Sequence, residues 1–268
     1  MNADEHRETR KFRLGSTSWV YPADIPSNVW RLTGLVEDVE LVLFEGEEAS
    51  NLPHRETVAA LRRIATRYGM SYTVHLPTDL QLGSEGDQWA VSVEKALRVI
   101  RITRPLAPWA YIVHLNPDGA KDPTRWQERC TEALEVLARE AGGPEVLSVE
   151  NLENCPLEQL IPILDRVPVG LCLDVGHLWL RGREPVPLLR ACPDRLRVVH
   201  LHGVNQRDHE SLSWVPADSL RAVLKELIRQ EYKGVVTLEV FSVEDFFSSR
   251  ERVLSLLLLE EVKHWKPD

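Results

Sequence analysis

Short apolar runs rich in β-branched residues alternate with longer segments of helical periodicity from one end of the chain to the other. We expect eight strands, over residues 12–16, 39–45, 71–76, 110–116, 146–151, 169–174, 197–202 and 235–241. Eight strands in 268 residues leave about 33 residues for each strand–helix unit, close to the spacing of a (β/α)8 TIM barrel. A doubly wound open sheet is the alternative, but LGSTSW after the first strand lacks that fold's glycine-rich phosphate turn. We therefore predict an α/β protein with a single (β/α)8 barrel over residues 12–268, preceded by a flexible arm at residues 1–11.

Several of the expected helices carry clear start and stop signals. Asp122 followed by Pro123 predicts the N-cap and first position of a helix that Gly142 ends. The Leu-Pro pair at 52–53 predicts the start of another helix, with Tyr68 on its buried face.

Composition excludes several classes of protein. Lysine and arginine number 32 against 41 aspartates and glutamates, so the net charge of −9 disfavours a nucleic acid or an anionic membrane as partner. The polar N-terminus and the short apolar runs indicate neither a secretory signal nor a membrane span, so we expect a cytoplasmic protein. The four dispersed cysteines predict buried thiols and no disulfide framework.

Polar side chains end six consecutive strands of the expected barrel, from the third to the eighth. They are His75, His114, Glu150, Asp174, His200 and Glu239. In a TIM barrel the carboxyl ends of the strands surround the active site, so we expect these side chains to converge. His177 follows Asp174 closely enough to join them, and His202 lies on the same side of its strand as His200.

A group of buried imidazoles and carboxylates this large carries an energetic cost that some opposite charge has to offset. A single polar residue at a strand end is more often structural, but six together would cost several kcal/mol per unpaired charge, which divalent cations remove. One ion takes four to six ligands, so this set predicts two or three, with zinc or manganese favoured. Such ions lower the pKa of a bound water and hold the oxygens of an in-line displacement, which predicts a hydrolase acting on a phosphoester or a glycosyl-phosphate.

Five short segments carry a family resemblance. Glu150 in SVEN, Asp174 and His177 in LDVGH, His200 in HLHG and Glu239 in TLEVF resemble the metal ligands of the xylose-isomerase-like TIM barrels. That superfamily, of the AP endonuclease 2 and sugar phosphate isomerase-epimerase type, includes sugar epimerases and endonuclease IV. The resemblance implies that these residues bind divalent metals.

Further residues resemble the multi-metal endonuclease branch more than the single-metal epimerases. His75 and His114 match additional ligands of that branch, and the resemblance implies Asp208 and His209 as further ligands. The branch has D-x-H at this loop, whereas Asp208 and His209 are adjacent here, so the residues implied for a third metal depart from the pattern of the branch. Whether His200, His202 or both bind metal stays open.

Longer strings in the N-terminal third carry a narrower resemblance. GSTSWVYPADIPSNV, DVELVLFEGEEASNLP and YTVHLPTDLQL resemble the cobamide-remodelling phosphodiesterases of the same superfamily. This resemblance implies hydrolysis of the nucleotide loop of a corrinoid at the phosphoribosyl bond, in corrinoid salvage.

Additional side chains are candidates for contacts with a small-molecule substrate, either a corrinoid or a phosphorylated sugar. Glu45 is expected to end the second strand, and a salt bridge to a loop arginine is an equal alternative. Arg207 has the bidentate geometry that suits a phosphate. His202, together with Trp19 and Trp179 in expected loops, completes this set, the tryptophans by stacking on a flat ring.

Three functions follow in order of preference. The first is a metal-dependent phosphodiesterase in which Glu150 orients or deprotonates the attacking water, with Glu239 and His177 as further catalytic residues. The second is a single-metal sugar or sugar-phosphate isomerase or epimerase, with Glu150 and Glu239 as the acid–base pair. The third is a binding protein that kept the fold without turnover.

Overall fold

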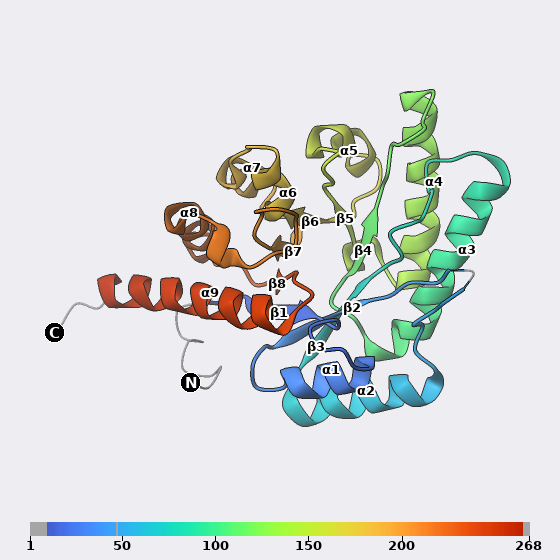
Figure 1. Cartoon of the computed structure of the whole chain (residues 1–268). Coiled ribbons are helices and arrows are strands. Elements are labelled where there is room, and N and C mark those ends of the chain that lie inside the picture. The colour runs from blue at the N-terminus through green and yellow to red at the C-terminus, as the bar shows by residue number, and fades with distance from the viewer. Residues whose placement is uncertain (1–9, 47, 265–268) are drawn as a thin grey trace. The chain divides into compact units, whose positions relative to one another are not determined.

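The computed structural model describes residues 10–46 and 48–264, with side chains described as far as residue 259. Eight parallel strands form a closed barrel in chain order, which confirms the predicted (β/α)8 fold (Figure 1). The strands are β1 (Arg13–Thr17), β2 (Asp38–Val42), β3 (Ser71–His75), β4 (Tyr111–His114), β5 (Leu147–Glu150), β6 (Gly170–Asp174), β7 (Leu196–Leu201) and β8 (Val235–Leu238). Every predicted strand is present, within a few residues of its expected limits.

Helices follow the strands along the chain. They are α1 (Ile25–Leu32), α2 (Arg55–Tyr68), α3 (Gly86–Thr103), α4 (Pro123–Ala141), α5 (Leu157–Leu164), α6 (Val175–Leu180), α7 (Pro185–Ala191), α8 (Ala217–Arg229) and α9 (Val243–His264), with short 3₁₀ turns η2 (Arg104–Leu106), η3 (Pro144–Val146) and η4 (Leu212–Trp214). The predicted cap of α4 is confirmed, because Asp122 accepts hydrogen bonds from the amides of Thr124 and Arg125 and Gly142 ends the helix in the left-handed conformation.

The chain divides into two compact units, one of residues 40–173 and one of residues 1–39 with 174–268. In the first unit α3 and α4 pack side by side (Figure 1). Strands β4 and β5 pair there in a register that sets His114 opposite Glu150. The first unit therefore carries two of the predicted ligands as direct neighbours across a strand pair.

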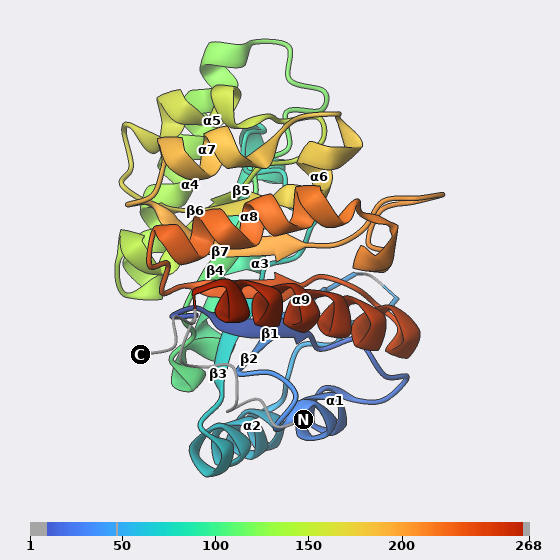
Figure 2. The same cartoon turned by 90° about the vertical axis from the view of Figure 1, so that its left-hand side faces the viewer.

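In the second unit α8 and α9 pack against each other (Figure 2), and β7 and β8 pair so that His200 lies opposite Thr237. The predicted arm at residues 1–9 lies outside the described residues. Arg10, which we placed in that arm, is buried and donates hydrogen bonds to both carboxylate oxygens of Glu37. Arg10 is therefore part of the packed structure, whereas the division into an arm and a barrel domain stays a prediction.

The predicted start of α2 lies two residues too early. The helix begins at Arg55, with His54 in the N-cap position, because Asn51 accepts from the Phe44 amide and donates to the Val42 carbonyl. Those bonds keep the chain extended before residue 54. Tyr68, predicted to face inward, is exposed at the last position of the helix.

The cysteines are free thiols, and three are buried as predicted. They are Cys130, Cys155 and Cys172, whereas Cys192 is only half-buried. Burial raises the pKa of Cys155 to about 12, so its thiolate is strongly disfavoured.

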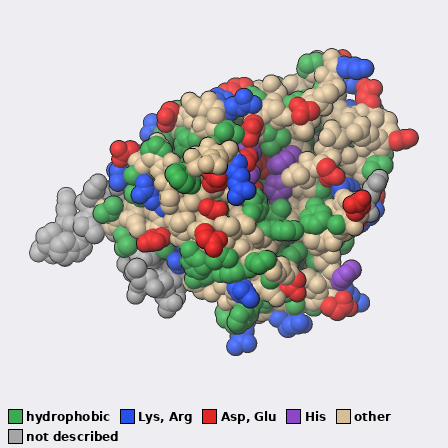
Figure 3. Space-filling model, viewed as in Figure 1, with side chains coloured by type: hydrophobic (Ala, Val, Ile, Leu, Met, Phe, Trp, Pro, Cys, Tyr) green, Lys and Arg blue, Asp and Glu red, His purple; other side chains and the backbone are tan. Residues whose placement is uncertain are grey.

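Charged side chains of both signs lie on the face of the molecule that Figure 3 shows, where they are interspersed. Among the helices described here, none is long and apolar enough to span a bilayer.

Candidate metal centre

The unit of residues 40–173 brings together His75, His114 and Glu150, which are the last residues of β3, β4 and β5. The Nε2 atoms of His75 and His114 lie 3.2 and 3.0 Å from the same oxygen, Oε2 of Glu150. The two rings meet edge to face, with their centroids 4.7 Å apart. These three predicted ligands therefore form one cluster.

Hydrogen bonding determines the tautomer of His75. Its Nδ1 lies 2.7 Å from the carbonyl oxygen of Leu76, which only accepts, so Nδ1 carries the proton. In the neutral ring, Nε2 then directs a lone pair at the carboxylate of Glu150. Two lone pairs at that distance repel, and either a second ring proton on Nε2 or a bound metal ion relieves the repulsion. Histidines that bind a metal through one ring nitrogen usually donate a hydrogen bond from the other ring nitrogen, often to a backbone carbonyl, and this bond fixes the orientation of the ring.

The burial of these three side chains also favours a bound cation. His75 and Glu150 are almost completely buried, whereas His114 is half-buried. A buried carboxylate needs a counter-charge, and two imidazoles with one carboxylate are donors that zinc and manganese accept. The first cluster therefore fits a divalent metal.

The unit of residues 1–39 and 174–268 gathers further predicted ligands around Asp174, the last residue of β6. One oxygen of Asp174 accepts a hydrogen bond from the His177 amide at 2.7 Å, which caps α6 and sets the direction of its first turn. The other oxygen lies 3.4 Å from His177 Nδ1 and 3.9 Å from His200 Nδ1. His200 Nδ1 also lies 3.0 Å from Oε2 of Glu239, just after β8.

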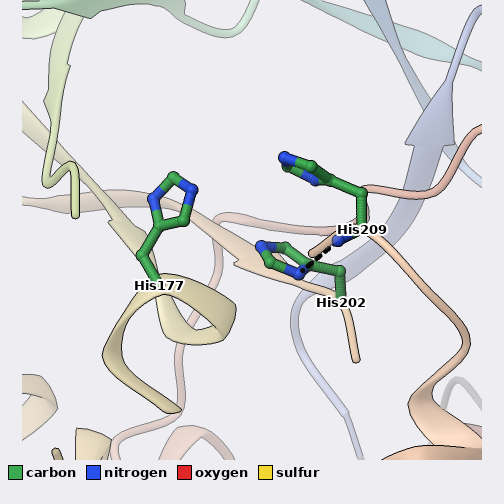
Figure 4. Close-up of side chains that lie close together, drawn as sticks. All are labelled: His177, His202 and His209. Carbon is green, nitrogen blue, oxygen red and sulfur yellow. Dashed lines mark hydrogen bonds between the residues drawn. The ribbon is translucent and has the colours of Figure 1, made fainter. Parts of the chain in front are cut away.

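Three histidines of the same unit form a second cluster, His177, His202 and His209 (Figure 4). His177 comes from α6, His202 follows β7, and His209 comes from the loop after it. The ring centroids of His202 and His209 are 4.2 Å apart, and that of His177 lies 5.6 and 6.0 Å from these two. The structure thus joins His202, predicted to contact substrate, to residues predicted to bind metal.

The negative charge around His202 changes its pKa. Burial by itself lowers the pKa, but the charge and hydrogen bond of Asp174, with a contribution from Glu239, outweigh it and raise the pKa to about 9. A divalent cation beside these carboxylates would offset the charge that produces this shift.

Asp208, Arg207 and Glu45 differ from the clustered residues in their surroundings. Asp208 lies 3.6 Å from Nε2 of its neighbour His209 and is half-exposed. Arg207 is 73% exposed in its side chain and lies 3.6 Å from Glu210. The expectation that Glu45 ends β2 was wrong, because β2 ends at Val42. Its carboxylate accepts a 2.6 Å hydrogen bond from Arg98, so the salt bridge considered as the alternative is present, but its arginine belongs to helix α3 and not to a loop.

The tryptophans predicted to contact substrate are accessible to different degrees. Trp19 is 44% exposed after β1, and Trp179 is half-buried. Trp179 lines a cavity of about 360 Å³ with Trp214. Among the described residues, the buried indole nitrogen of Trp179 has no hydrogen-bond partner, so an acceptor on a ligand would satisfy it.

Sequence reasoning missed a cavity of about 550 Å³ in the unit of residues 40–173. The loops after β3 and β4 line it with residues that include Gln81 and Asn116, together with Trp126 from the first turn of α4. Asn116 comes two residues after His114, and Asn154 donates a hydrogen bond to it at 3.0 Å. Nothing in the polar loop sequence distinguished these amides from ordinary solvated residues.

Sequence and structure comparisons agree on the fold. A family model described as xylose isomerase-like TIM barrel matches residues 36–259. No curated protein shows significant similarity to the chain. Among solved structures, a D-tagatose 3-epimerase-like protein superimposes with a TM-score of 0.78 at 20% identity, covering 94% of this chain and 99% of its own.

Two further structures are similar in the same way. Endonuclease IV from Thermus thermophilus gives a TM-score of 0.71 at 22% identity, covering 93% of this chain and 99% of its own. A D-psicose 3-epimerase, solved in the presence of D-fructose, gives 0.70 at 15% identity, with 94% and 99% covered. At these identities the likeness shows the fold alone.

Proposed function

The chain belongs to the xylose isomerase-like TIM-barrel family, whose members include metal-dependent enzymes. On this basis we propose that the protein is a divalent-metal-dependent phosphodiesterase. The observation that carries the proposal is the number of candidate donors, because each unit contains a cluster of its own: His75, His114 and Glu150 in one unit, and His177, His202 and His209 in the other. Each cluster offers donors of the kind that a divalent ion binds. A single-metal reaction needs fewer histidines than this.

The proposed ligand set keeps every predicted member. It comprises His75, His114, Glu150, Asp174, His177, His200, Asp208, His209 and Glu239. Ions bound there would polarise a phosphoester and activate water. Glu150 would orient the attacking water, because its carboxylate already lies against two imidazoles. The catalytic roles of Glu239 and His177 stay predictions.

The proposed substrate is a corrinoid, cleaved at the phosphoribosyl bond of its nucleotide loop. Water adds its oxygen to phosphorus, the bond from phosphorus to the ribose oxygen breaks, and that oxygen takes a proton. The N-terminal strings that resemble cobamide-remodelling phosphodiesterases support this substrate. So do the two cavities, which have the size of small-molecule sites and offer amides in one and tryptophans in the other.

Incubation of the metal-loaded protein with adenosylcobalamin tests the substrate. We expect a phosphate-bearing corrinoid and a free riboside by mass spectrometry, and loss of both products with Glu150→Gln. Absence of these products from fully metal-loaded protein would contradict the corrinoid assignment. Unchanged product formation by Glu150→Gln would contradict the proposed role of Glu150.

A second candidate is a single-metal sugar or sugar-phosphate epimerase. The comparisons favour it over the corrinoid hydrolase, because two of the three neighbours described above carry epimerase names and none names a corrinoid enzyme. Glu150 and Glu239 would then be the acid–base pair on adjacent carbons. Deuterium incorporation at a sugar carbon, with a ketohexose in deuterium oxide, would support this candidate and count against the hydrolase.

A further inference from the structure

His202 occupies a different position from the histidines that fit metal binding. It is completely buried, and both of its ring nitrogens face groups of the protein. Nδ1 lies 3.0 Å from the backbone nitrogen of His209, which donates to it (Figure 4). Nε2 lies 3.2 and 3.3 Å from the two carboxylate oxygens of Asp174.

These contacts restrict where the ring hydrogen lies. In the neutral ring, acceptance of the His209 amide hydrogen at Nδ1 requires the proton to be on Nε2, where it is donated to Asp174. If the ring carries both protons, Nε2 is protonated again and Nδ1 faces the carbonyl of Gly203 at 3.3 Å. Only the tautomer with its proton on Nδ1 leaves a lone pair on Nε2 for a metal. That tautomer, like the doubly protonated ring, sets an Nδ1–H against the His209 N–H, so the neutral ring with its proton on Nε2 fits these contacts best.

His75 and His209 show the opposite arrangement. In each, Nδ1 faces a backbone carbonyl, Leu76 at 2.7 Å and Glu239 at 3.2 Å, so the proton lies on Nδ1 and Nε2 keeps its lone pair. A backbone carbonyl, that of Gly203 at 3.3 Å, also lies near Nδ1 of His202, but the backbone N–H of His209 is closer at 3.0 Å and donates to this nitrogen. This N–H distinguishes His202 from the two histidines suited to binding metal.

Packing fixes the His202 ring in place. A methyl group at Gly176, between Asp174 and His177, would come within 2.1 Å of the ring, so the imidazole lies directly on the backbone of this turn. One ring therefore contacts Asp174, the start of α6 that carries His177, and the backbone of His209.

We propose that His202 is a positioning residue that orients Asp174 and the His209 loop through its two nitrogens and does not itself bind metal. The inference rests on the metal site of the proposed function. The sequence allowed two roles for His202, a metal ligand or a substrate contact, and the proposed role differs from both.

The direct test is the protonation state of the ring. Protein labelled with ¹⁵N-histidine is compared with and without zinc, and the His202 signals are assigned by their loss in His202→Asn. We expect Nε2 to carry hydrogen in both states, while nitrogens of other histidines shift on zinc binding. A zinc-shifted, unprotonated Nε2 of His202 would overturn this inference and leave the metal enzyme intact. If no histidine responds to zinc, the proposed function fails and this inference with it.

Paired variants supply a second readout, the zinc dissociation constant measured by chelator competition. The Gln amide nitrogen takes roughly the place of Nε2, and the Asn amide oxygen roughly that of Nδ1. We expect His202→Ala and His202→Asn to weaken zinc binding by about 10- to 100-fold without lowering the number of bound ions, and His202→Gln to recover most of the affinity. The exposed His54→Ala is the matched control. Loss of one whole zinc equivalent in His202→Gln would overturn the proposal, as would equal behaviour of Gln and Asn.

Discussion

Nε2 of His75 lies 3.2 Å from Oε2 of Glu150, although 75 positions of sequence separate the two residues. Each ends its own strand, and the parallel strands place both at the same edge of the sheet. A neutral His75 ring with its proton on Nδ1 directs the lone pair of Nε2 at this carboxylate, an arrangement that favours a cation shared by the two side chains.

Glu150→Gln should abolish metal binding at the first cluster. The substitution keeps the shape of the side chain but removes the charge that two imidazoles face. Loss of a group that only orients a metal ligand costs about 10- to 100-fold in affinity, so loss of this direct ligand should exceed about 100-fold. Isothermal titration with manganese or zinc measures the effect. The exposed Glu56→Gln on α2 serves as control, and equal affinities of the two variants would argue against a ligand role for Glu150.

Metal removal should lower thermal stability. A ligand at 100 times its dissociation constant stabilises the folded state by about 2.7 kcal/mol, which corresponds to roughly 5 to 10 °C in a domain of this size. Calorimetry before and after chelation measures the shift, and zinc should restore the original melting temperature. A chelated protein that melts at the same temperature would show that metal does not contribute to the fold.

Glu226 should make the protein sensitive to strong acid. Hydrogen bonds from Arg229, opposed by burial and reinforced by Arg190 and Gln230, lower its pKa to about 2 from 4.5. The ionised Glu226 contributes fully to the free energy of unfolding above pH 4.5, and this contribution is lost as the pH falls toward 2. Glu226→Gln should therefore cost roughly 1 to 3 kcal/mol at pH 7 and much less near pH 2. Urea unfolding at the two pH values checks this, and a cost independent of pH would be the opposite result.

Gly83→Ala should disturb the larger cavity. A methyl group at Gly83 would come within 2.0 Å of the Trp126 indole, which is held by a 3.0 Å hydrogen bond to the Asn116 carbonyl. Overpacking of this kind costs about 1 to 3 kcal/mol. Tryptophan fluorescence and urea unfolding report the change, with Gly46→Ala as control because its nearest contact is an ordinary 3.5 Å. Identical unfolding of both variants would refute the close packing.

Much of the fold was predictable because its signals are local. Apolar runs determined all eight strands, and the polar residues that end them identified His75, His114 and Glu150 from the sequence. The N-cap at Asp122 was equally predictable, since it depends on adjacent residues alone.

The remaining features depend on long-range partners. Glu45 was assigned to a strand end because the apolar run continues past Val42, but Arg98 from α3 binds its carboxylate. The environment of His202 was hidden for the same reason, because a tautomer is selected by the groups around both nitrogens. The spacing of residues in the sequence predicts neither the ion pair of Glu45 nor the tautomer of His202.

The number of bound metal ions is the most direct test of the account. Elemental analysis of protein purified without added metal, repeated after saturation with zinc or manganese, counts the ions per chain. Two or three equivalents, with at least one lost in Glu150→Gln, is the predicted result. A single equivalent that supports full activity would contradict the multi-metal phosphodiesterase and favour the epimerase, and no bound metal would contradict both.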